Sequence, residues 1–445
     1  MNKLRKYFYI SFAALSVGFI VFIIILNGRE KPIPQLKERN QYISNTSEWL
    51  NTKAAIEGLL FALRENPNNQ KAKLQLAEAY MQESRITGDH AYYDKASLQL
   101  INGVLKAEPE NYDAICCLAT VYLSQHHFAD ALPVGEKAIK INPYNSFGFG
   151  LLVDANVELG NYDEAVKMAD KMVSVRPDGR SYSRISYLRE IHGDVNGAIA
   201  AMKMAVEAGY PGLEQTEWCR IQLGKLYEQT GDLTKANLQY YNANYLRANY
   251  VYALTGLGRI EKGNKNYPAA IDYYEKAKEM VKDYSFSDEL TDLYRLNNEP
   301  TKAANQAVKV VEMLNSEAQK GNDDQQAGHY ADRELAIAYL KVNDFDNALK
   351  HALIEYNRRP NNIDVNQTLA WVYYKRGEYA DADKYIKVAM KTNSQNPELL
   401  YEAGLIYVKS GNSTEGLVLM KKSLEINPFL RVELKNEGNA YLAMK

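Results

Sequence analysis

The residues that could take part in chemistry are few and scattered along the 445-residue chain. Its six histidines show neither the H-E-x-x-H spacing nor the carboxylate spacing of a metal site. Two of them, His126 and His127, fall at a predicted hairpin turn, where we interpret them as polar turn residues. Gly256 and Gly258 lack the third glycine of a dinucleotide loop, and Asn264 stands where a phosphate loop needs lysine. The sequence therefore predicts no catalytic residue, no metal ion and no cofactor.

The cysteines and the overall charge narrow the function classes further. Cys116, Cys117 and Cys219 form neither an even disulfide set nor a metal-ligand spacing, so we expect free, half-buried thiols. Hydrophobic residues make up 46% and charged residues 24%, as in ordinary folded soluble proteins. The net charge of -2 supplies no global field for nucleic acid, and we expect no nucleic-acid partner.

The first thirty residues differ from the rest of the chain. Three basic residues within the tail 1–6 precede an uncharged apolar run over 7–27. About twenty helical residues span the roughly 30 Å of a bilayer's hydrocarbon core, so we predict a transmembrane signal anchor. Residues 28–40 contain two prolines and mixed charges, which is typical of a short stiff spacer.

The processing and orientation of this segment stay open. Its end, residues 24–28, lacks the small A-x-A residues of a cleavage site, which favours an uncleaved anchor over a cleaved signal peptide. Basic residues flank both sides in near-equal number, so the positive-inside count is close to a tie. We predict that the following domain lies outside the cytoplasm, in the periplasm, with the cytoplasmic side as the alternative.

The remainder of the chain repeats itself at intervals of 33 or 34 residues. The residue pattern of each unit predicts a helix, a short turn that often contains glycine, and a second helix. Tyrosine recurs at unit position 11, a small residue at position 20, and proline at position 32 of several units. The aligned units begin at Tyr112, Ser146, Gly179, Glu217, Val251, Tyr284, His329, Ile363 and Pro397.

Each recurring residue type has a physical cause. Alanine at position 20 allows two helix axes to approach within about 8–10 Å and keeps helix propensity high. Proline has no amide hydrogen and clashes with the preceding turn, so it ends the second helix. A tyrosine ring fills the wedge between neighbouring hairpins with its hydroxyl at the rim, which accounts for many of the 34 tyrosines.

This spacing resembles the tetratricopeptide repeat family over roughly residues 40–428. In one unit the resemblance is carried by Leu118, Ala119, Tyr122, Phe128, Ala131, Ala138 and Pro143. The departures are Asn156, Arg189 and Glu261 in place of the position-11 tyrosine, and Gly416 in place of the alanine. The resemblance implies an all-α, right-handed superhelical solenoid of about ten helix-turn-helix hairpins behind the transmembrane helix.

The repeat pattern also predicts how this array is divided. The unit beginning at Tyr284 is 45 residues long, because its second helix overruns through Lys320 and is followed by the Gly- and Asp-rich segment 321–328. We predict a first lobe at 41–320, a loop or hinge at 321–328 and a second lobe at 329–428. Residues 429–445 form a capping helix or a tail.

A stacked array of hairpins has a concave face that can bind a partner. Family resemblance places unit positions 2, 5, 9 and 12 on this groove. The predicted partner-binding residues are Lys225, Arg259, Lys262, Tyr330, Arg333, Trp371, Tyr374, Tyr401 and Leu405. The alternative is that the aromatic residues pack against the next hairpin or beneath the tail. No asparagine occupies position 9, which disfavours the family's terminal-carboxylate clamp.

The predicted function is therefore a non-catalytic, membrane-anchored scaffold that binds proteins or peptides in its groove. Two alternatives stay open: a structural subunit of an envelope secretion, surface-assembly or polysaccharide-export complex, and a regulatory subunit of a separate enzyme. The oligomeric state does not follow from the sequence.

Overall fold

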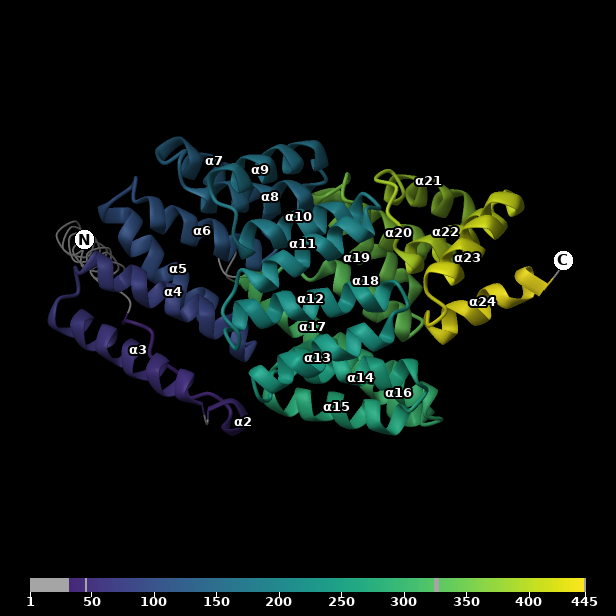
Figure 1. Cartoon of the computed structure of the whole chain (residues 1–445), viewed down its shortest axis with the longest axis horizontal. Helices are drawn as coiled ribbons and strands as arrows, with labels where there is room; N and C mark the ends of the chain where they lie inside the picture. The colour runs from purple at the N-terminus through teal and green to yellow at the C-terminus, as the bar shows by residue number, and fades with distance from the viewer. Residues whose placement is uncertain (1–31, 45, 324–327, 444–445) are drawn as a thin grey trace, which may run out of the picture. The chain divides into compact units, whose positions relative to one another are not determined.

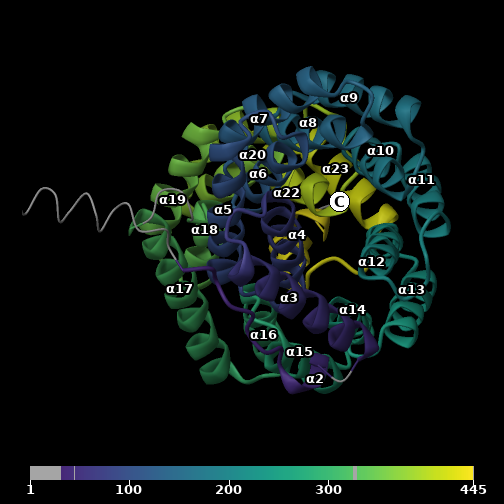
Figure 2. The same cartoon turned by 90° about the vertical axis from the view of Figure 1, so that its left-hand side faces the viewer.

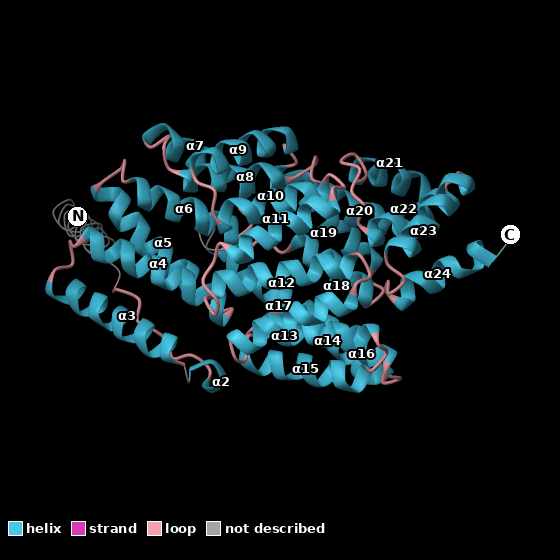
Figure 3. Cartoon of the chain, viewed as in Figure 1, coloured by secondary structure: helices cyan, strands magenta, loops and turns pink. Residues whose placement is uncertain are grey.

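The computed structural model describes residues 32–44, 46–323 and 328–443, which form helices and loops without a strand (Figure 3). Among the described residues, those from 38 onward form one compact unit, and residues 32–37 fall outside it. The predicted basic tail and transmembrane anchor, residues 1–27, lie outside the described residues. Within the described residues, no helix has both the length and the apolar character needed to cross a bilayer. The last residues of the predicted spacer, 38–40, are part of the compact unit.

The described part of the chain contains twenty-three helices (Figure 1). The first twelve are α2 Gln41–Ser44, α3 Ser47–Glu65, α4 Gln70–Thr87, α5 His90–Ala107, α6 Tyr112–Ser124, α7 Phe128–Ile141, α8 Ser146–Leu159, α9 Tyr162–Val175, α10 Gly179–Ile191, α11 Val195–Glu207, α12 Glu214–Gln229 and α13 Leu233–Leu246. The others are α14 Val251–Gly263, α15 Tyr267–Met280, α16 Tyr284–Leu296, α17 Pro300–Asp323, α18 Asp332–Lys341, α19 Phe345–Arg358, α20 Ile363–Arg376, α21 Tyr379–Ala389, α22 Pro397–Lys409, α23 Ser413–Ile426 and α24 Val432–Ala443.

The twenty helices from α4 to α23 pair in chain order into ten hairpins, as the repeat pattern predicts. The unit predicted to begin at Glu217 begins three residues earlier, at Glu214. Helix α17 overruns as predicted and extends to Asp323, within the segment predicted as a loop or hinge. Both predicted lobes lie in the one compact unit.

The recurring alanines lie where the two helices of a hairpin cross. Ala165, Ala198 and Ala270 are completely buried, as a close approach of helix axes requires. The position-11 tyrosines are buried or half-buried, and some hydroxyls reach polar partners at the rim. Tyr294 Oη donates to Glu275 over 2.5 Å, and Asn315 donates to Tyr339 Oη over 3.0 Å. The packing roles predicted for the alanines and the tyrosines are therefore confirmed.

Every hairpin turn contains one residue in the left-handed backbone region. These ten residues are Gly88, His126, Gly160, Gly193, Gly231, Lys265, Asn298, Asn343, Gly377 and Gly411. Glycine adopts positive φ without steric cost, and asparagine and histidine tolerate it better than most other residues. The turn geometry is thus common to all ten hairpins, although only six of the ten turns use glycine.

The hairpins wind so that successive superhelical turns touch one another. Helices α6 to α20 follow a ring when the array is viewed end-on (Figure 2). Tyr330 N donates to Gln125 O over 3.1 Å, and Asn362 Nδ2 donates to Glu158 O over 2.9 Å. These partners are 205 and 204 residues apart. Because such a hairpin spans about 34 residues, one superhelical turn takes about six hairpins.

Additional helices pack at both ends of the array. At the amino-terminal end, Arg39 forms a buried ion pair with Glu83 at 2.5 Å and lies over the Trp49 ring at 4.6 Å. At the other end, residues 432–443 of the predicted capping segment form α24. Its Leu434 is buried, and the backbone oxygen of Lys435 accepts a hydrogen bond from Tyr401.

Candidate functional site

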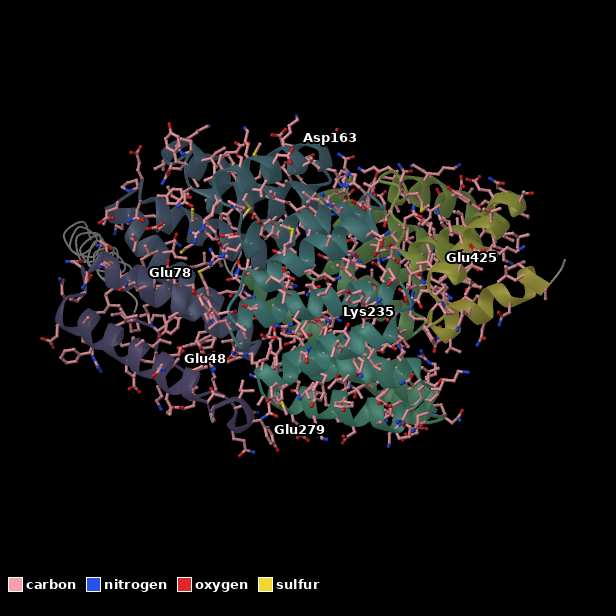
Figure 4. All side chains as sticks on the ribbon, viewed as in Figure 1. Glu48, Glu78, Asp163, Lys235, Glu279 and Glu425 are labelled. Carbon is pink, nitrogen blue, oxygen red and sulfur yellow. The ribbon has the colours of Figure 1, made fainter. Side chains whose placement is uncertain are left out.

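The first helices of the hairpins surround an elongated cavity within the array, which we call the lumen. Its volume is about 2390 Å³, and all ten first helices contribute side chains to its wall. These helices are α4, α6, α8, α10, α12, α14, α16, α18, α20 and α22. The second helices lie farther out: Asp163 on α9 and Glu279 on α15 lie at opposite outer edges (Figure 4). The lumen is therefore the concave face that the repeat predicts.

Five of the nine predicted binding residues line the lumen. They are Lys225, Arg259, Lys262, Arg333 and Trp371. Each comes from the first helix of its hairpin, at the unit positions that the family resemblance assigns to the groove. Their side chains face the cavity because the opposite face of each first helix packs against its own hairpin partner.

Three of the predicted aromatic and apolar residues are core residues in the structure. Tyr401 and Leu405 are completely buried, and Tyr374 is 8% exposed. Tyr374 stacks against the Trp371 ring, with centroids 4.8 Å apart and an interplanar angle of 9°. The prediction that these three residues line the open groove is wrong, because α24 and neighbouring hairpins cover that end of the array.

Tyr330, the remaining predicted residue, lies at the contact between superhelical turns. Its ring stacks on His127 with centroids 4.1 Å apart, and the guanidinium of Arg358 lies 3.9 Å from its centre. Its amide donates to Gln125 O. Tyr330 therefore stabilises the winding of the array in this structure and is absent from the lumen wall.

The tail forms part of the lumen wall at its carboxy-terminal end. Residues 427–435 and Glu437 contribute to the lining. Arg431 pairs with Glu398 and Glu402 at 3.0 Å each, and Lys375 pairs with Glu437. Lys375 Nζ also lies 4.8 Å from the Trp371 ring centre. The tail thus narrows this end and leaves the rest of the cavity open.

Charge is balanced along the lumen. Fourteen lysines and arginines and fourteen aspartates and glutamates line it. Many of them neutralise one another: Arg184 lies 2.5 Å from Asp154, and Arg259 lies 2.9 Å from Glu228. The wall therefore lacks the continuous positive track that binds a nucleic-acid backbone.

Helices α10 and α12 carry a group of side chains with a different character, which we call the lumen patch: Arg180, Tyr187, Trp218 and Lys225. Seven residues separate the two members on each helix, so each pair shares one helix face. Tyr187 and Trp218 are each 37% exposed, unusual for large aromatic side chains inside an array. Among the described residues, no carboxylate oxygen lies within 4.0 Å of the Arg180 or Lys225 side chain.

The lumen walls alter the acid–base properties of the groups around this patch. Burial within the lumen, together with the nearby Arg259 guanidinium, lowers the pKa of Lys225 to about 8. Burial raises the pKa of Glu190 to about 7, against the hydrogen bond from Gln229, which favours the carboxylate. In both residues burial disfavours the charged form. A partner's carboxylate beside Lys225, or a partner's cation beside Glu190, would therefore stabilise the charged form of that residue.

Of the four lumen-patch residues, only Lys225 is among the predicted partner-binding residues. Arg180, Trp218 and Tyr187 are not. Trp218 occupies position 2 and Tyr187 position 9 of their units, both groove positions. The positional rule therefore contained the signal, but the recurring tyrosines at core positions concealed it.

The three cysteines are free thiols, and they are buried, not half-buried as predicted. Burial raises the pKa of the Cys116 thiol to about 11, with Asp113 adding to the shift. The Tyr112 hydroxyl partly offsets it. The thiol therefore stays protonated near neutral pH, which suits a packing residue better than a nucleophile.

The ten-hairpin array with its lumen defines an all-α repeat solenoid. Residues 397–429, which form the hairpin α22–α23, match the family profile of the tetratricopeptide repeat. The family match covers this one hairpin of the ten.

Comparison with known proteins gives distant similarities. Cellulose synthase operon protein C of Pseudomonas fluorescens (strain SBW25) is 24% identical over 390 residues, which covers 86% of this chain and 27% of that protein. A thermophilic tetratricopeptide-repeat protein of Thermus thermophilus is 21% identical over 43% of this chain and 97% of its own, with a TM-score of 0.38. A chain of the APC/C hetero-tetramer Cut9–Hcn1 is 16% identical. The match covers 86% of this chain and 70% of that chain, with a TM-score of 0.42.

Proposed function

We propose that the protein is a non-catalytic scaffold that binds an extended segment of a partner protein in its lumen. The observation that carries this proposal is the lumen patch. It combines two exposed aromatic rings with two cations that have no carboxylate oxygen within 4.0 Å, in a cavity where most of the other cations are ion-paired. Rigid aromatic side chains provide anchoring area at low entropic cost, and arginine beside them is typical of binding hot spots.

The chemistry of the wall favours a peptide of mixed charge. An acidic side chain of the partner would meet Arg180 or Lys225, and an apolar side chain would lie against Trp218 or Tyr187. The balanced charge of the remaining wall suits alternating polar groups. A cavity of about 2390 Å³ exceeds the roughly 300–1,000 Å³ of small-molecule pockets, so an extended chain fits it better.

We propose further that residues 7–27 anchor the protein in the cytoplasmic membrane and that the array lies on the periplasmic side. The support is the uncharged apolar run preceded by basic residues. Cysteine-accessibility labelling tests the side directly, because the native cysteines are buried and Asn68 is exposed. Asn68→Cys in intact cells should react with a membrane-impermeant reagent; labelling only after lysis would place the array in the cytoplasm.

A structural subunit of a polysaccharide-export complex is the second candidate. The similarity to cellulose synthase operon protein C, which extends over most of this chain, favours it. In that role the array would bridge other subunits. The segment bound in the lumen would then belong to one constant subunit of the complex. A regulatory subunit of a separate enzyme is a third possibility that the sequence left open.

Co-purification of the full chain from gently solubilised membranes separates these roles. A scaffold should retain several sub-stoichiometric partners, whereas a structural subunit should retain one stoichiometric set. The variant Trp218→Ala/Lys225→Ala should lose most of the retained protein, because both side chains face the lumen. Tyr245→Ala is the matched control, because Tyr245 is 76% exposed and lies outside the lumen lining.

Unchanged retention by the double variant, with a melting curve like that of the wild type, would contradict lumen binding. Turnover of a substrate by the isolated chain would contradict the non-catalytic role.

A further inference from the structure

The two superhelical turns meet at five successive corners. In each corner, a hairpin turn from the first half of the array contacts the carboxy-terminal end of a second helix, or the loop that follows it, about 200 residues later. The contacting pairs are Gly88 with Lys282, His126 with Tyr330, Gly160 with Asn361, Gly193 with Asn393, and Gly231 with Ile426. The same geometry thus recurs at regular intervals along the array.

Four of these corners have glycine at the left-handed position, and the second corner has histidine. A Cβ atom built at Gly88, Gly160 or Gly193 would overlap the backbone of the opposing loop. His126 has φ of 61° and directs an imidazole toward that loop instead. Since left-handed backbone costs a residue with a Cβ on the order of 1 kcal/mol, its presence there invites a functional explanation.

The imidazole of His126 meets two further metal-ligand side chains. They are His329, which precedes α18, and Glu334, which lies within α18. One possible ligand atom from each of the three side chains lies within 4.8 Å of the other two. The two histidine rings lie 4.1 Å apart, centre to centre. Glu334 Oε2 is buried and has no hydrogen-bond partner. A buried carboxylate oxygen normally has a partner, so this atom lacks one that a cation would supply.

The hydrogen bonds of the two histidines leave a nitrogen of each ring available. His126 Nδ1 lies 3.1 Å from Tyr330 O, and His329 is hydrogen-bonded to the Ser124 backbone. A backbone carbonyl that accepts one ring N–H fixes the tautomer and exposes the lone pair of the other nitrogen.

We propose that His126, His329 and Glu334 form a binding site for a divalent transition-metal cation of the zinc type. Two imidazole nitrogens and one carboxylate oxygen match the ligand set of zinc sites that keep a fourth position for water. Calcium and magnesium prefer oxygen ligands throughout and fit this set poorly. Movement of the side-chain tips by about 1 Å would bring the three atoms to the separations of a tetrahedral site.

The position of the site gives it a structural consequence. It joins the α6–α7 turn to the segment that leads into α18, residues 203 or more apart in sequence. A bound cation would link the two superhelical turns at this corner and reduce their relative movement. This inference does not depend on the identity of the lumen partner.

Metal binding to the purified full chain tests the proposal. After treatment with a chelator, the protein is dialysed against Zn²⁺ alone, and bound metal is measured per chain. We expect one ion per chain in the wild type, and at least tenfold weaker binding in His126→Asn, His329→Gln and Glu334→Gln. Asparagine is chosen at position 126 because Asn298 and Asn343 adopt the same backbone conformation at equivalent turns. His192→Ala, which alters another hairpin turn, is the matched control.

Two additional measurements keep the test decisive if a histidine variant misfolds. Glu334→Gln preserves the side-chain volume, and circular dichroism reports whether it is folded. The Co²⁺ absorption spectrum reports tetrahedral coordination by nitrogen and oxygen in the wild type. Failure of the wild type to bind one ion, or undiminished binding by folded Glu334→Gln and His329→Gln, would overturn the proposal.

Discussion

Glycine at a hairpin turn performs two separable tasks in this protein. Gly160 and Gly377 both have φ of 80° and both end the first helix of a hairpin, at α8 and α20. A Cβ at Gly160 would overlap the Asn361 carbonyl of the neighbouring superhelical turn, whereas a Cβ at Gly377 would meet nothing within 4 Å. The first glycine is therefore required by packing as well as by backbone conformation.

This difference predicts unequal effects of the same substitution. Gly377→Ala should lower the free energy of unfolding by about 1 kcal/mol through backbone strain alone. Gly160→Ala should cost a further 1–3 kcal/mol or so, because the clash must separate the two superhelical turns. Urea denaturation measures both values, and small-angle scattering should show expansion of Gly160→Ala only. Equal losses in the two variants would contradict the close contact of the turns.

The two buried histidines at the second corner predict a pH dependence of stability. Their pKa values of about 4 lie below the ordinary value of 6.5, chiefly because of burial. The groups that face them are His90, Arg333, Arg359 and Glu334. Between pH 6.5 and 4 the unfolded chain binds more protons than the folded one, so the free energy of unfolding falls as the pH falls.

The double variant His126→Asn/His329→Gln should show a shallower fall over this window than the wild type. Melting temperatures measured in chelator between pH 7 and pH 4 give the comparison. Carboxylates titrate in both proteins, so only the difference between the curves is informative. Parallel curves would show that the two histidines are not held neutral by the fold.

At the scale of the element, the sequence pattern predicts most helix boundaries, because contacts between residues close in sequence determine where each helix begins and ends. The alanine, tyrosine and proline positions of each hairpin report contacts between residues less than 35 positions apart. The overrun of α17 was visible for the same reason, since its helix-forming residues continue past the usual unit length. Longer-range packing left no comparable mark on the sequence.

The carboxy-terminal hairpins show where that limit lies. Tyr374, Tyr401 and Leu405 occupy groove positions by unit numbering, yet they are buried. Helix α24 covers this end: its Gly438 lies so close to Tyr401 that an added Cβ would overlap the phenol ring. Such docking depends on a helix outside the repeat, which the repeat pattern cannot describe.

The buried aromatic pair predicts a stability effect instead of a binding effect. Tyr374→Ala should lower the free energy of unfolding by about 3 kcal/mol, as truncation of a buried aromatic ring does. Its stacking partner Trp371 is only half-buried, so Trp371→Ala should cost less. Urea denaturation measures both. A melting curve unchanged by Tyr374→Ala would show that α24 does not cover this side chain in solution.

At the scale of the whole molecule, winding brings distant residues together. The repeat predicted a concave face, and the structure shows a lumen enclosed by two superhelical turns that touch. Contacts such as Asn362 to Glu158 and Arg359 to Glu158, the latter at 2.5 Å, join residues about 200 positions apart. The candidate metal site arises in the same way, which explains why histidine spacing gave no sign of it.

Site-specific photo-crosslinking in native membranes tests the central claim that the lumen binds a partner segment. A photoreactive phenylalanine analogue replaces Trp218 in the lumen patch or, as control, Tyr245 on the outer surface of α13. We predict a discrete protein adduct from position 218 that weakens with Lys225→Glu, and none of the same size from position 245. An adduct of equal yield at both positions, or no protein adduct from position 218, would contradict the account.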